Sequence, residues 1–139
     1  MQPIYLVVGV PGSGKSWCCE QLTEKFEYIN HDGYIYLKRP GHYLKVVLEK
    51  AKTAEKPLLI EAPFSVNETK DPLEKAGYNV IPVFIIEPEP VLRARYLKRE
   101  KKLIPQGHIT RMQTYAKRAN EWKAFRGTSA EVYEYLKRV

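Results

Sequence analysis

Hydrophobic residues gather in four short runs along the chain, and segments of helical length separate one run from the next. The runs span residues 4–8, 28–30, 58–60 and 80–86. Short apolar runs of this kind are typical of strands that are buried on both faces. The pattern therefore predicts four strands, each followed by a helix.

The intervening and C-terminal segments predict helices near residues 15–26, 41–54, 68–77, 88–101, 108–123 and 129–138. Pro40, Pro57 and Pro72 are expected at helix boundaries or in first turns, and Gly77 is expected to cap a helix C-terminus. No strand-like run follows the fourth one. Pro82 lies inside that fourth run, and its missing backbone donor favours a strand at the edge of the sheet.

This order of elements predicts an α/β fold with a small four-stranded parallel sheet flanked by helices, because parallel neighbours need helical crossover connections. The chain has 139 residues, of which 44% are hydrophobic and 28% are charged. Residues 1–139 are therefore expected to form a single domain with an ordinary hydrophobic core. In folds of this class, ligands bind beside the carboxyl ends of the strands.

The clearest motif follows the first run directly and precedes a helical segment. It matches G-x-x-x-x-G-K-[ST], the pattern of a loop that binds nucleotide phosphates, and so predicts a P-loop NTPase fold. Its residues are Gly9, Val10, Pro11, Gly12, Ser13, Gly14, Lys15 and Ser16, and Trp17 follows in the same predicted nucleotide site. The glycines allow backbone N–H groups to converge on the phosphates. We expect Lys15 to reach the β- and γ-phosphates of ATP, and Ser16 to coordinate Mg²⁺.

The formal net charge of +7 is concentrated in the last third of the chain. Residues 93–139 contain 13 Lys or Arg and 4 acidic residues. A positive field attracts phosphates, whether they belong to a nucleotide or to a nucleic acid. Taken singly, these cations fit a solvated helix surface equally well.

The sequence lacks the features of membrane insertion and of secretion. The first apolar run is too short to span a bilayer, and no basic segment with a cleavage site precedes it. Cys18 and Cys19 are neighbours on a predicted helix and point in different directions, so no structural disulfide is expected between them. These observations favour a protein of the reducing cytoplasm that has no membrane partner.

Phosphate loops occur in switches, motors and phosphotransferases. A GTPase switch needs a guanine-reading N/T-K-x-D element, and in the nearest match, residues 69–71, the aspartate comes one position early. Motor ATPases usually end an apolar strand in Asp-Glu, whereas the third run here ends in the single acid Glu61. A compact phosphotransferase remains. In it, Glu61 either holds Mg²⁺ through water or fixes the neighbouring loop.

A cluster of cations follows the fourth run, between residues 92 and 105. On a helix, Arg95 and Arg99 are i,i+4 neighbours, while Leu92 and Tyr96 form an adjacent apolar stripe that can pack inward. Arginines over a γ-phosphate stabilise the charge that develops during phosphoryl transfer. Within the segment, Glu100 is the only acid for six cations. This balance favours an Arg-rich lid over a salt-bridged surface helix.

The acceptor side is expected at the end of the second run, where Asp32 precedes a glycine. A carboxylate there can accept the proton of an attacking hydroxyl, which is the general-base role in kinases. A turn or a helix cap is the alternative role, because Asp-Gly favours turns. Four nearby residues either wall a ring-shaped substrate or pack against a helix: Tyr34, Tyr36, His42 and Tyr43.

The order of these motifs resembles the kinase domain of the bacteriophage-type 5′-hydroxyl polynucleotide kinases, within the broader P-loop kinases of nucleosides, nucleotides and small hydroxyl compounds. The resemblance covers most of residues 4–112 and rests on the phosphate loop, INHDGY, the acid that ends the third run, and LKREKKLIP. It implies the four-stranded parallel kinase core. It also implies that Asp32 deprotonates the 5′-hydroxyl, that Arg99 and Arg95 are lid arginines, and that Glu61 closes the third strand.

Two positions differ from the pattern of that family. The family has a phosphate-holding arginine three residues after the catalytic aspartate, where this chain has Ile35. Its D-x-N element after the third strand reads Glu61-Ala62-Pro63 here. The segment between Asp32 and Leu58 is also short for a nucleic-acid channel. The chemistry of the family therefore matches this chain better than its substrate does.

We therefore expect an ATP- and Mg²⁺-dependent kinase that phosphorylates a hydroxyl of a nucleoside, of a nucleotide or of a 5′-hydroxyl nucleic-acid end. One alternative is a nucleoside monophosphate kinase, whose acceptor is already an ionised phosphate and needs no base. The other is a nucleotide- and DNA-binding accessory protein that transfers no phosphate. Steady ADP production that depends on an acceptor separates an enzyme from such a binding protein.

Overall fold

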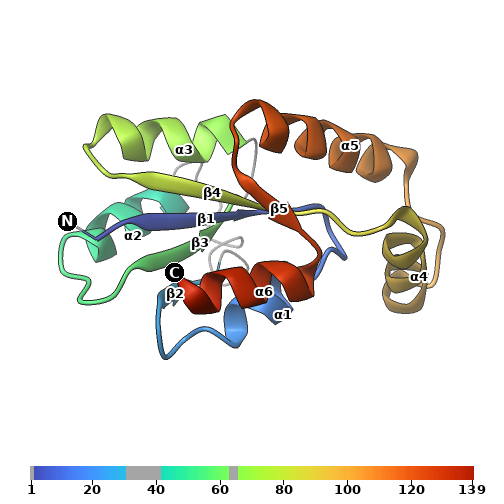
Figure 1. Cartoon of the computed structure of the whole chain (residues 1–139), viewed down its shortest axis with the longest axis horizontal. Helices are drawn as coiled ribbons and strands as arrows, with labels where there is room; N and C mark the ends of the chain where they lie inside the picture. The colour runs from blue at the N-terminus through green and yellow to red at the C-terminus, as the bar shows by residue number, and fades with distance from the viewer. Residues whose placement is uncertain (1, 31–41, 63–65) are drawn as a thin grey trace.

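The computed structural model describes residues 2–30, 42–62 and 66–139. Its centre is a parallel sheet of five strands in the order β2-β3-β1-β4-β5 (Figure 1). The strands are β1 (Ile4–Val8), β2 (Glu27–Ile29), β3 (Leu58–Glu61), β4 (Val80–Ile85) and β5 (Phe125–Gly127). The helices in this part of the chain are α1 (Lys15–Glu20), α2 (His42–Ala51), α3 (Val66–Lys75), α4 (Glu89–Glu100), α5 (Gln106–Glu121) and α6 (Ser129–Arg138).

Helices cover both faces of the sheet, as the alternation of apolar runs and helices predicts. On β1, Ile4, Leu6 and Val8 belong to a core shared with α2, α3 and α5. Tyr5 and Val7 belong to a second core, shared with α1 and α6 on the opposite face (Figure 1). β1 is paired along both edges and covered on both faces, which explains why its whole sequence is apolar.

The first four predicted strands are found within one residue of their expected ends, but the prediction of a four-stranded sheet is wrong. A fifth strand, β5, pairs in parallel with residues 83–85 of β4. It has only three residues, one of them charged and one a glycine, and it lies at the edge of the sheet. An edge strand so short carries no apolar run that a sequence pattern can reveal.

The expectation that the proline-containing strand lies at the edge is also wrong, because β4 lies between β1 and β5. Pairing with β5 begins at Val83, one residue after Pro82. The N–H of Ile86 donates to the carbonyl of Gly127 at 2.7 Å. Alternate residues of a parallel strand direct their N–H groups to the same neighbour, so the missing donor of Pro82 falls on the β5 side before β5 begins.

Two helices differ from expectation. α1 ends at Glu20 instead of near residue 26, and successive turns follow in which Leu22 N–H donates to Cys19 O at 3.1 Å and Phe26 N–H donates to Leu22 O at 2.9 Å. Burial of Phe26 fixes this tighter path into β2. Pro72 lies inside α3 and not in its first turn, on the solvent-exposed side of the helix.

The predicted cap at the end of α3 is confirmed. Gly77 has a φ of 95°, and its N–H donates to Glu74 O at 2.9 Å, while the N–H of Tyr78 donates to Leu73 O at 3.1 Å. This pair of bonds is the Schellman arrangement, which needs a residue that tolerates positive φ. Pro57 directly precedes β3, and Pro40 lies outside the described residues.

Cys18 and Cys19 are buried and form no disulfide, as expected. Within the described ranges, we find no helix long and apolar enough to cross a bilayer.

Candidate active site

The phosphate loop connects the carboxyl end of β1 to α1, in the middle of the sheet. Two of its glycines have a left-handed backbone, with φ of 85° at Gly12 and 96° at Gly14. Residues with a Cβ rarely adopt these values, which explains the spacing of glycines in the motif. The turn closes through a bond from Ser13 N–H to Val10 O at 3.1 Å.

Close packing also requires glycine in this loop. A Cβ on Gly9 would lie 2.5 Å from the Oγ of Ser13, which is fully buried beneath the loop. A Cβ on Gly14 would lie 2.9 Å from the Cβ of Ser129, the first residue of α6. The loop is therefore held from outside by α6, an element more than 100 residues away in the sequence.

Lys15 is folded back over the loop. Its Nζ donates to the carbonyl of Gly9 at 2.6 Å, so the ammonium lies across the turn formed by the motif. Lys15 also lines the cleft in front of the loop, and its role at the phosphates stays a prediction.

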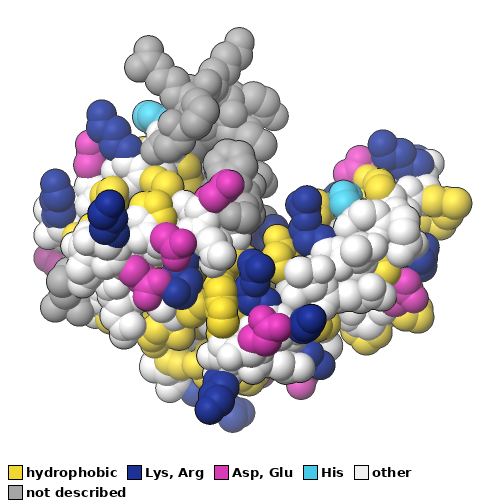
Figure 2. Space-filling model, turned by 90° about the horizontal axis from the view of Figure 1, so that it is seen from above, with side chains coloured by type: hydrophobic (Ala, Val, Ile, Leu, Met, Phe, Trp, Pro, Cys, Tyr) yellow, Lys and Arg dark blue, Asp and Glu magenta, His cyan; other side chains and the backbone are white. Residues whose placement is uncertain are grey.

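A cleft of about 470 Å³ opens in front of the loop. Figure 2 shows the molecule hollowed between its main body and the projecting part on the right, which carries α4, with Lys and Arg side chains at the edges. The predicted site residues that line the cleft are Val10, Pro11, Gly12, Gly14, Lys15, Ser16, Trp17, Glu61, Arg95 and Arg99. Gly9 and Ser13 belong to the same loop but lie beneath this surface. The structure thus brings together most of the residues that sequence patterns had assigned separately.

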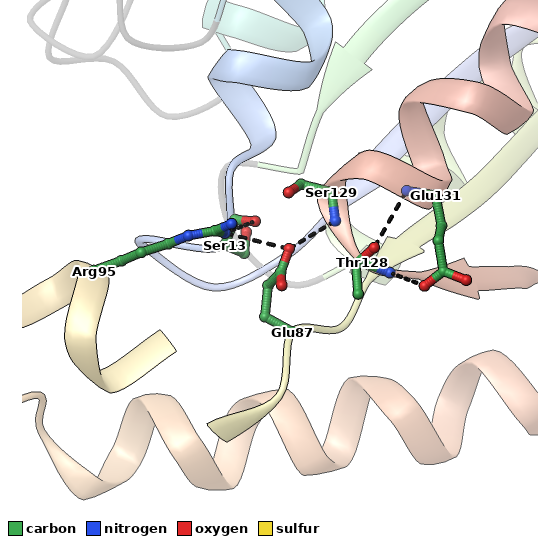
Figure 3. A network of polar contacts seen from close by, with 6 residues as sticks. All are labelled: Ser13, Glu87, Arg95, Thr128, Ser129 and Glu131. Atoms are coloured by element: carbon green, nitrogen blue, oxygen red, sulfur yellow. Dashed lines mark hydrogen bonds and ion pairs between the residues drawn. The ribbon is translucent and has the colours of Figure 1, made fainter. Parts of the chain in front are cut away.

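The cationic helix packs as its apolar stripe predicts. Leu92 and Tyr96 of α4 are buried in the core, which turns Arg95 and Arg99 toward the phosphate loop. Arg95 donates from Nη1 to the carbonyl of Ser13 at 3.2 Å (Figure 3). Arg99 makes an ion pair with its neighbour Glu100 at 2.9 Å and is about half exposed.

The expectation that Glu100 is the only acid available to these cations is wrong. Two acids just before the cationic segment also pair with it: Glu89 contacts Arg93 at 3.1 Å, and Glu87 contacts Arg95 at 3.2 Å. Glu87 follows β4 by two residues, and its side chain is buried. The sequence patterns above did not single out Glu87, although an acid at the carboxyl end of a strand is the signal that pointed to Glu61.

Glu61 ends β3 with its side chain buried and on the wall of the cleft. Its backbone N–H donates to the hydroxyl of Tyr43 at 3.2 Å, and that hydroxyl donates to the carbonyl of Ile29 at 2.7 Å. Tyr43 therefore joins the carboxyl ends of β2 and β3. Of the two roles considered for Tyr43, packing against the fold is the one that the structure supports.

Titratable groups behind the loop are held neutral by burial. Burial, with a smaller contribution from the Glu61 carboxylate, raises the pKa of the Tyr28 hydroxyl. Burial raises the pKa of the Cys18 thiol to about 11, and it raises that of Cys19 well above its usual value. Neither thiol supplies a thiolate nucleophile near neutral pH.

Asp32, the predicted general base, lies outside the described residues, as do Tyr34 and Tyr36. The last described strand residue before Asp32 is Ile29, which Tyr43 ties to the Glu61 end of β3. The role of Asp32 therefore stays a prediction.

The oxygen donors that line the cleft suit Mg²⁺ better than a metal ion that is coordinated entirely by protein side chains. Within the described ranges, no three His, Cys, Asp or Glu side chains are grouped as a metal site. Ser16 and Glu61 both line the cleft beside the phosphate loop. Mg²⁺ usually takes one or two protein oxygens and completes its shell with water and substrate phosphates, so these residues fit it.

No family model matches the sequence, and no curated protein matches it. Several solved structures match at the level of the fold. A gluconokinase from Sinorhizobium meliloti 1021 has a TM-score of 0.61 at 20% identity, over 95% of this chain and 87% of that chain. The Deinococcus radiodurans tunicamycin resistance protein has a TM-score of 0.67 at 17% identity, over 97% of this chain and 93% of that chain.

A shikimate kinase from Acinetobacter baumannii, in complex with shikimate, has a TM-score of 0.60 at 14% identity, over 99% of this chain and 92% of that chain. These matches show that the chain shares their α/β fold, in which helices flank a parallel sheet. Within this fold, the phosphate loop follows the central strand β1, and the arginine-bearing α4 follows β4. The finer resemblance to phage-type polynucleotide kinases stays a prediction.

The Tyr43 bridge gives a test of how the site is held together. Tyr43→Phe removes the hydroxyl that links Ile29 to Glu61 and leaves a buried N–H and C=O without that partner. We expect a loss of about 1–3 kcal/mol in the free energy of unfolding, measured by urea denaturation. Tyr133→Phe, on a partly exposed face of α6, is the control and should change stability by less than about 0.5 kcal/mol. Equal effects of the two substitutions would contradict the bridging role.

Proposed function

We propose that the protein is an ATP- and Mg²⁺-dependent kinase that transfers the γ-phosphate to a hydroxyl group of a small molecule or of a nucleic-acid end. The observation that carries this proposal is the convergence of Lys15, Glu61, Arg95 and Arg99 on one cleft in front of the phosphate loop. These side chains come from three separate elements of the fold, α1, β3 and α4. Phosphoryl transfer needs mainly positioning and charge stabilisation, and this cleft offers both.

The phosphate loop binds the nucleotide. Its backbone, turned by Gly12 and Gly14, offers N–H groups to the β-phosphate, and Lys15 adds a charge that reaches the β- and γ-phosphates. Ser16 would coordinate Mg²⁺ and Glu61 would hold it through water, and the ion would supply positive charge at the phosphates. The exposed ring of Trp17 forms part of the cleft wall next to these residues.

Arg99 acts in the transition state. Its pairing with Glu100 is an exposed ion pair between sequence neighbours, which contributes on the order of 1 kcal/mol or less. Exchange of that partner for a phosphoryl group therefore costs little. A planar guanidinium then stabilises the charge that spreads over the transferring group.

Asp32 accepts the proton of the attacking hydroxyl in this proposal. It follows Ile29 by three residues, and the end of that strand is tied to Glu61 at the cleft. The resemblance of INHDGY to the base-bearing segment of polynucleotide kinases supports the same role. The departure at Ile35 and the shortness of the following segment favour a small acceptor, such as a nucleoside or nucleotide, over a long nucleic acid.

Structural neighbours extend the set of acceptors that deserve testing. One is by name a gluconokinase, and another is a shikimate kinase in complex with shikimate. A screen should therefore include small polyhydroxy compounds alongside nucleosides, nucleoside monophosphates and 5′-hydroxyl oligonucleotides. An acceptor that reacts through a phosphate would favour a nucleoside monophosphate kinase. Nucleotide binding without any transfer would favour a non-catalytic accessory protein.

The first test is transfer of labelled γ-phosphate from ATP across that screen, with and without Mg²⁺. We expect one acceptor class to become labelled, and Lys15→Ala to abolish the transfer, because backbone donors alone cannot replace the ammonium at the β- and γ-phosphates. Lys52→Ala, on the exposed turn after α2 and outside the cleft, is the matched control and should leave transfer unchanged. Full activity of Lys15→Ala would remove the loop from the mechanism.

Arg99→Ala should lower kcat much more than it raises the KM for ATP, because its charge acts mainly in the transition state. Loss of one such donor typically costs about 10²–10³ in kcat. Arg99→Lys should recover only part of this loss, since an ammonium lacks the planar fork. Steady-state kinetics with the best acceptor provide the measurement. An effect confined to KM would make Arg99 a ground-state clamp for ATP.

Asp32→Asn separates the roles considered for this residue. General-base catalysis contributes about 10²–10⁴ in rate, so kcat should fall by that order if the acceptor is a hydroxyl. If the acceptor is a phosphate, the KM for the acceptor should rise instead. If Asp32 only caps a turn, asparagine replaces it well and neither constant should move. A kcat within about threefold of the parent value would rule out the general-base role.

A further inference from the structure

Glu87 is a buried carboxylate that no part of the proposed reaction uses. It follows β4 by two residues and precedes α4, and its side chain is only 4% exposed. Figure 3 shows it pointing between two neighbouring elements, with Arg95 of α4 on one side and the first turn of α6 on the other. Burying a charged carboxylate costs free energy unless ion pairs and hydrogen bonds compensate it.

The contacts of Glu87 form a short chain that ends at the phosphate loop. Its Oε1 accepts from the backbone N–H of Ser129 at 2.7 Å and lies 3.2 Å from Nη1 of Arg95. The same Nη1 donates to the carbonyl of Ser13 at 3.2 Å. One carboxylate oxygen thus connects the start of α6 to an arginine that rests on the loop (Figure 3).

These contacts compensate the burial of the charge. Ser129 is the first residue of the ten-residue helix α6, whose N-terminus carries a partial positive charge, and Arg95 adds a full one. Both contacts of Glu87 are with groups that keep their protons, a backbone N–H and a guanidinium, so neither of them gives Glu87 a proton to remove. These contacts suit a carboxylate that fixes the groups around it.

We propose that Glu87 is a positioning residue that holds the Arg95 guanidinium at the phosphate loop before nucleotide binds. Free arginine side chains lose rotamer entropy when they are ordered. Glu87 and the Ser13 carbonyl order Arg95 in advance, although 43% of its side chain is exposed. The inference rests on the proposed function, because it assumes that phosphates occupy the cleft.

The two arginines of α4 that line the cleft therefore have different roles. Arg95 is fixed by a buried partner on another element, whereas Arg99 pairs with an exposed sequence neighbour and can exchange that partner. Arg95 offers its charge to the phosphates in a position that is already fixed. Arg99 contacts the phosphates only after it leaves its partner Glu100. Preorganised charge is the more effective kind, since it needs no reorganisation when the ligand arrives.

A second consequence concerns the charge of Glu87 itself. Without Arg95, a buried carboxylate would stand beside the phosphate loop and repel an incoming nucleotide. Removing one partner of a buried ion pair is usually much more damaging than removing both. Arg95→Ala should therefore weaken binding more than the loss of one phosphate contact does, and Glu87→Gln should restore part of that loss.

The test is a double-mutant cycle of wild type, Glu87→Gln, Arg95→Ala and the double variant. The dissociation constant of AMP-PNP, a non-hydrolysable ATP analogue, is measured by calorimetry in the presence of Mg²⁺, and the Tm of each protein is measured alongside. Glutamine keeps the acceptor for Ser129 N–H but removes the charge that holds Arg95. We expect Glu87→Gln alone to weaken binding about tenfold, and the double variant to bind at least about threefold more tightly than Arg95→Ala.

Glu131→Gln is the matched control. Glu131 is a carboxylate of the same helix N-terminus, and it accepts from Thr128 N–H at 3.0 Å within the capping box, without contact to Arg95 (Figure 3). Hydrogen bonds from the backbone and the side chain of Thr128 lower the pKa of the Glu131 carboxyl. Glu131→Gln should lower the Tm and leave AMP-PNP binding unchanged. This outcome separates a helix-capping effect from positioning of the arginine.

The possible failures are distinguishable. If Glu87→Gln weakens binding by the same factor in the presence and absence of Arg95, the effects are additive and the positioning role is wrong. If the wild type does not bind AMP-PNP, the proposed function fails, and with it the role inferred for Glu87. Should Glu87→Gln not fold, Glu87→Asp keeps the charge but withdraws it by one methylene. It should then weaken AMP-PNP binding, and unchanged binding in that variant would overturn the inference.

Discussion

The phosphate loop can keep its shape only if glycine occupies the positions where neighbouring elements press on it. A Cβ on Gly12 would lie in van der Waals contact with Leu92 of α4. A Cβ on Gly14 would lie closer than van der Waals distance to Ser129 of α6. The loop therefore fixes the distance at which α4 and α6 pack against the sheet. Because those helices follow β4 and β5, the placement of the arginines depends on the whole carboxyl end of the sheet and not on the loop alone.

The sequence predicted the parts of the fold whose signal is local. The apolar residues of β1 and the motif after it lie within a few positions of each other, so pattern and spacing were sufficient. β5 could not be found in this way, because Phe125 and Gly127 are recognised as a strand only by their pairing with β4. Glu87 has the local signal of an acid at a strand end, but its contact with Ser129, 42 positions away, could not be predicted from a local pattern. Tyr43 was ambiguous until its hydroxyl could be placed between two strand ends.

Net charge overstates the cationic character of the site. The excess of Lys and Arg in the last third of the chain predicted a strong attraction for phosphates, yet Arg93, Arg95 and Arg99 each have a carboxylate partner in the structure. These three ion pairs differ in whether the carboxylate partner of the arginine is buried or exposed. An exposed carboxylate competes weakly with a phosphate, whereas a buried one sets the geometry of its arginine. Local pairing, more than total charge, therefore determines which cations are free to meet a ligand.

In the proposed kinase, the two halves of the sheet position different parts of the site. β1, β4 and β5 lead into the phosphate loop, α4 and α6. The loop and α4 line the cleft, and α6 packs behind the loop at Gly14. β2 and β3 lead toward Asp32 and Glu61, and Tyr43 ties their ends together. In the proposal, the acceptor lies toward the end of β2, whereas Glu61 at the end of β3 shares the cleft with Lys15 and Arg95. This separation explains why the motifs of nucleotide chemistry are easier to recognise in this chain than any signature of its acceptor.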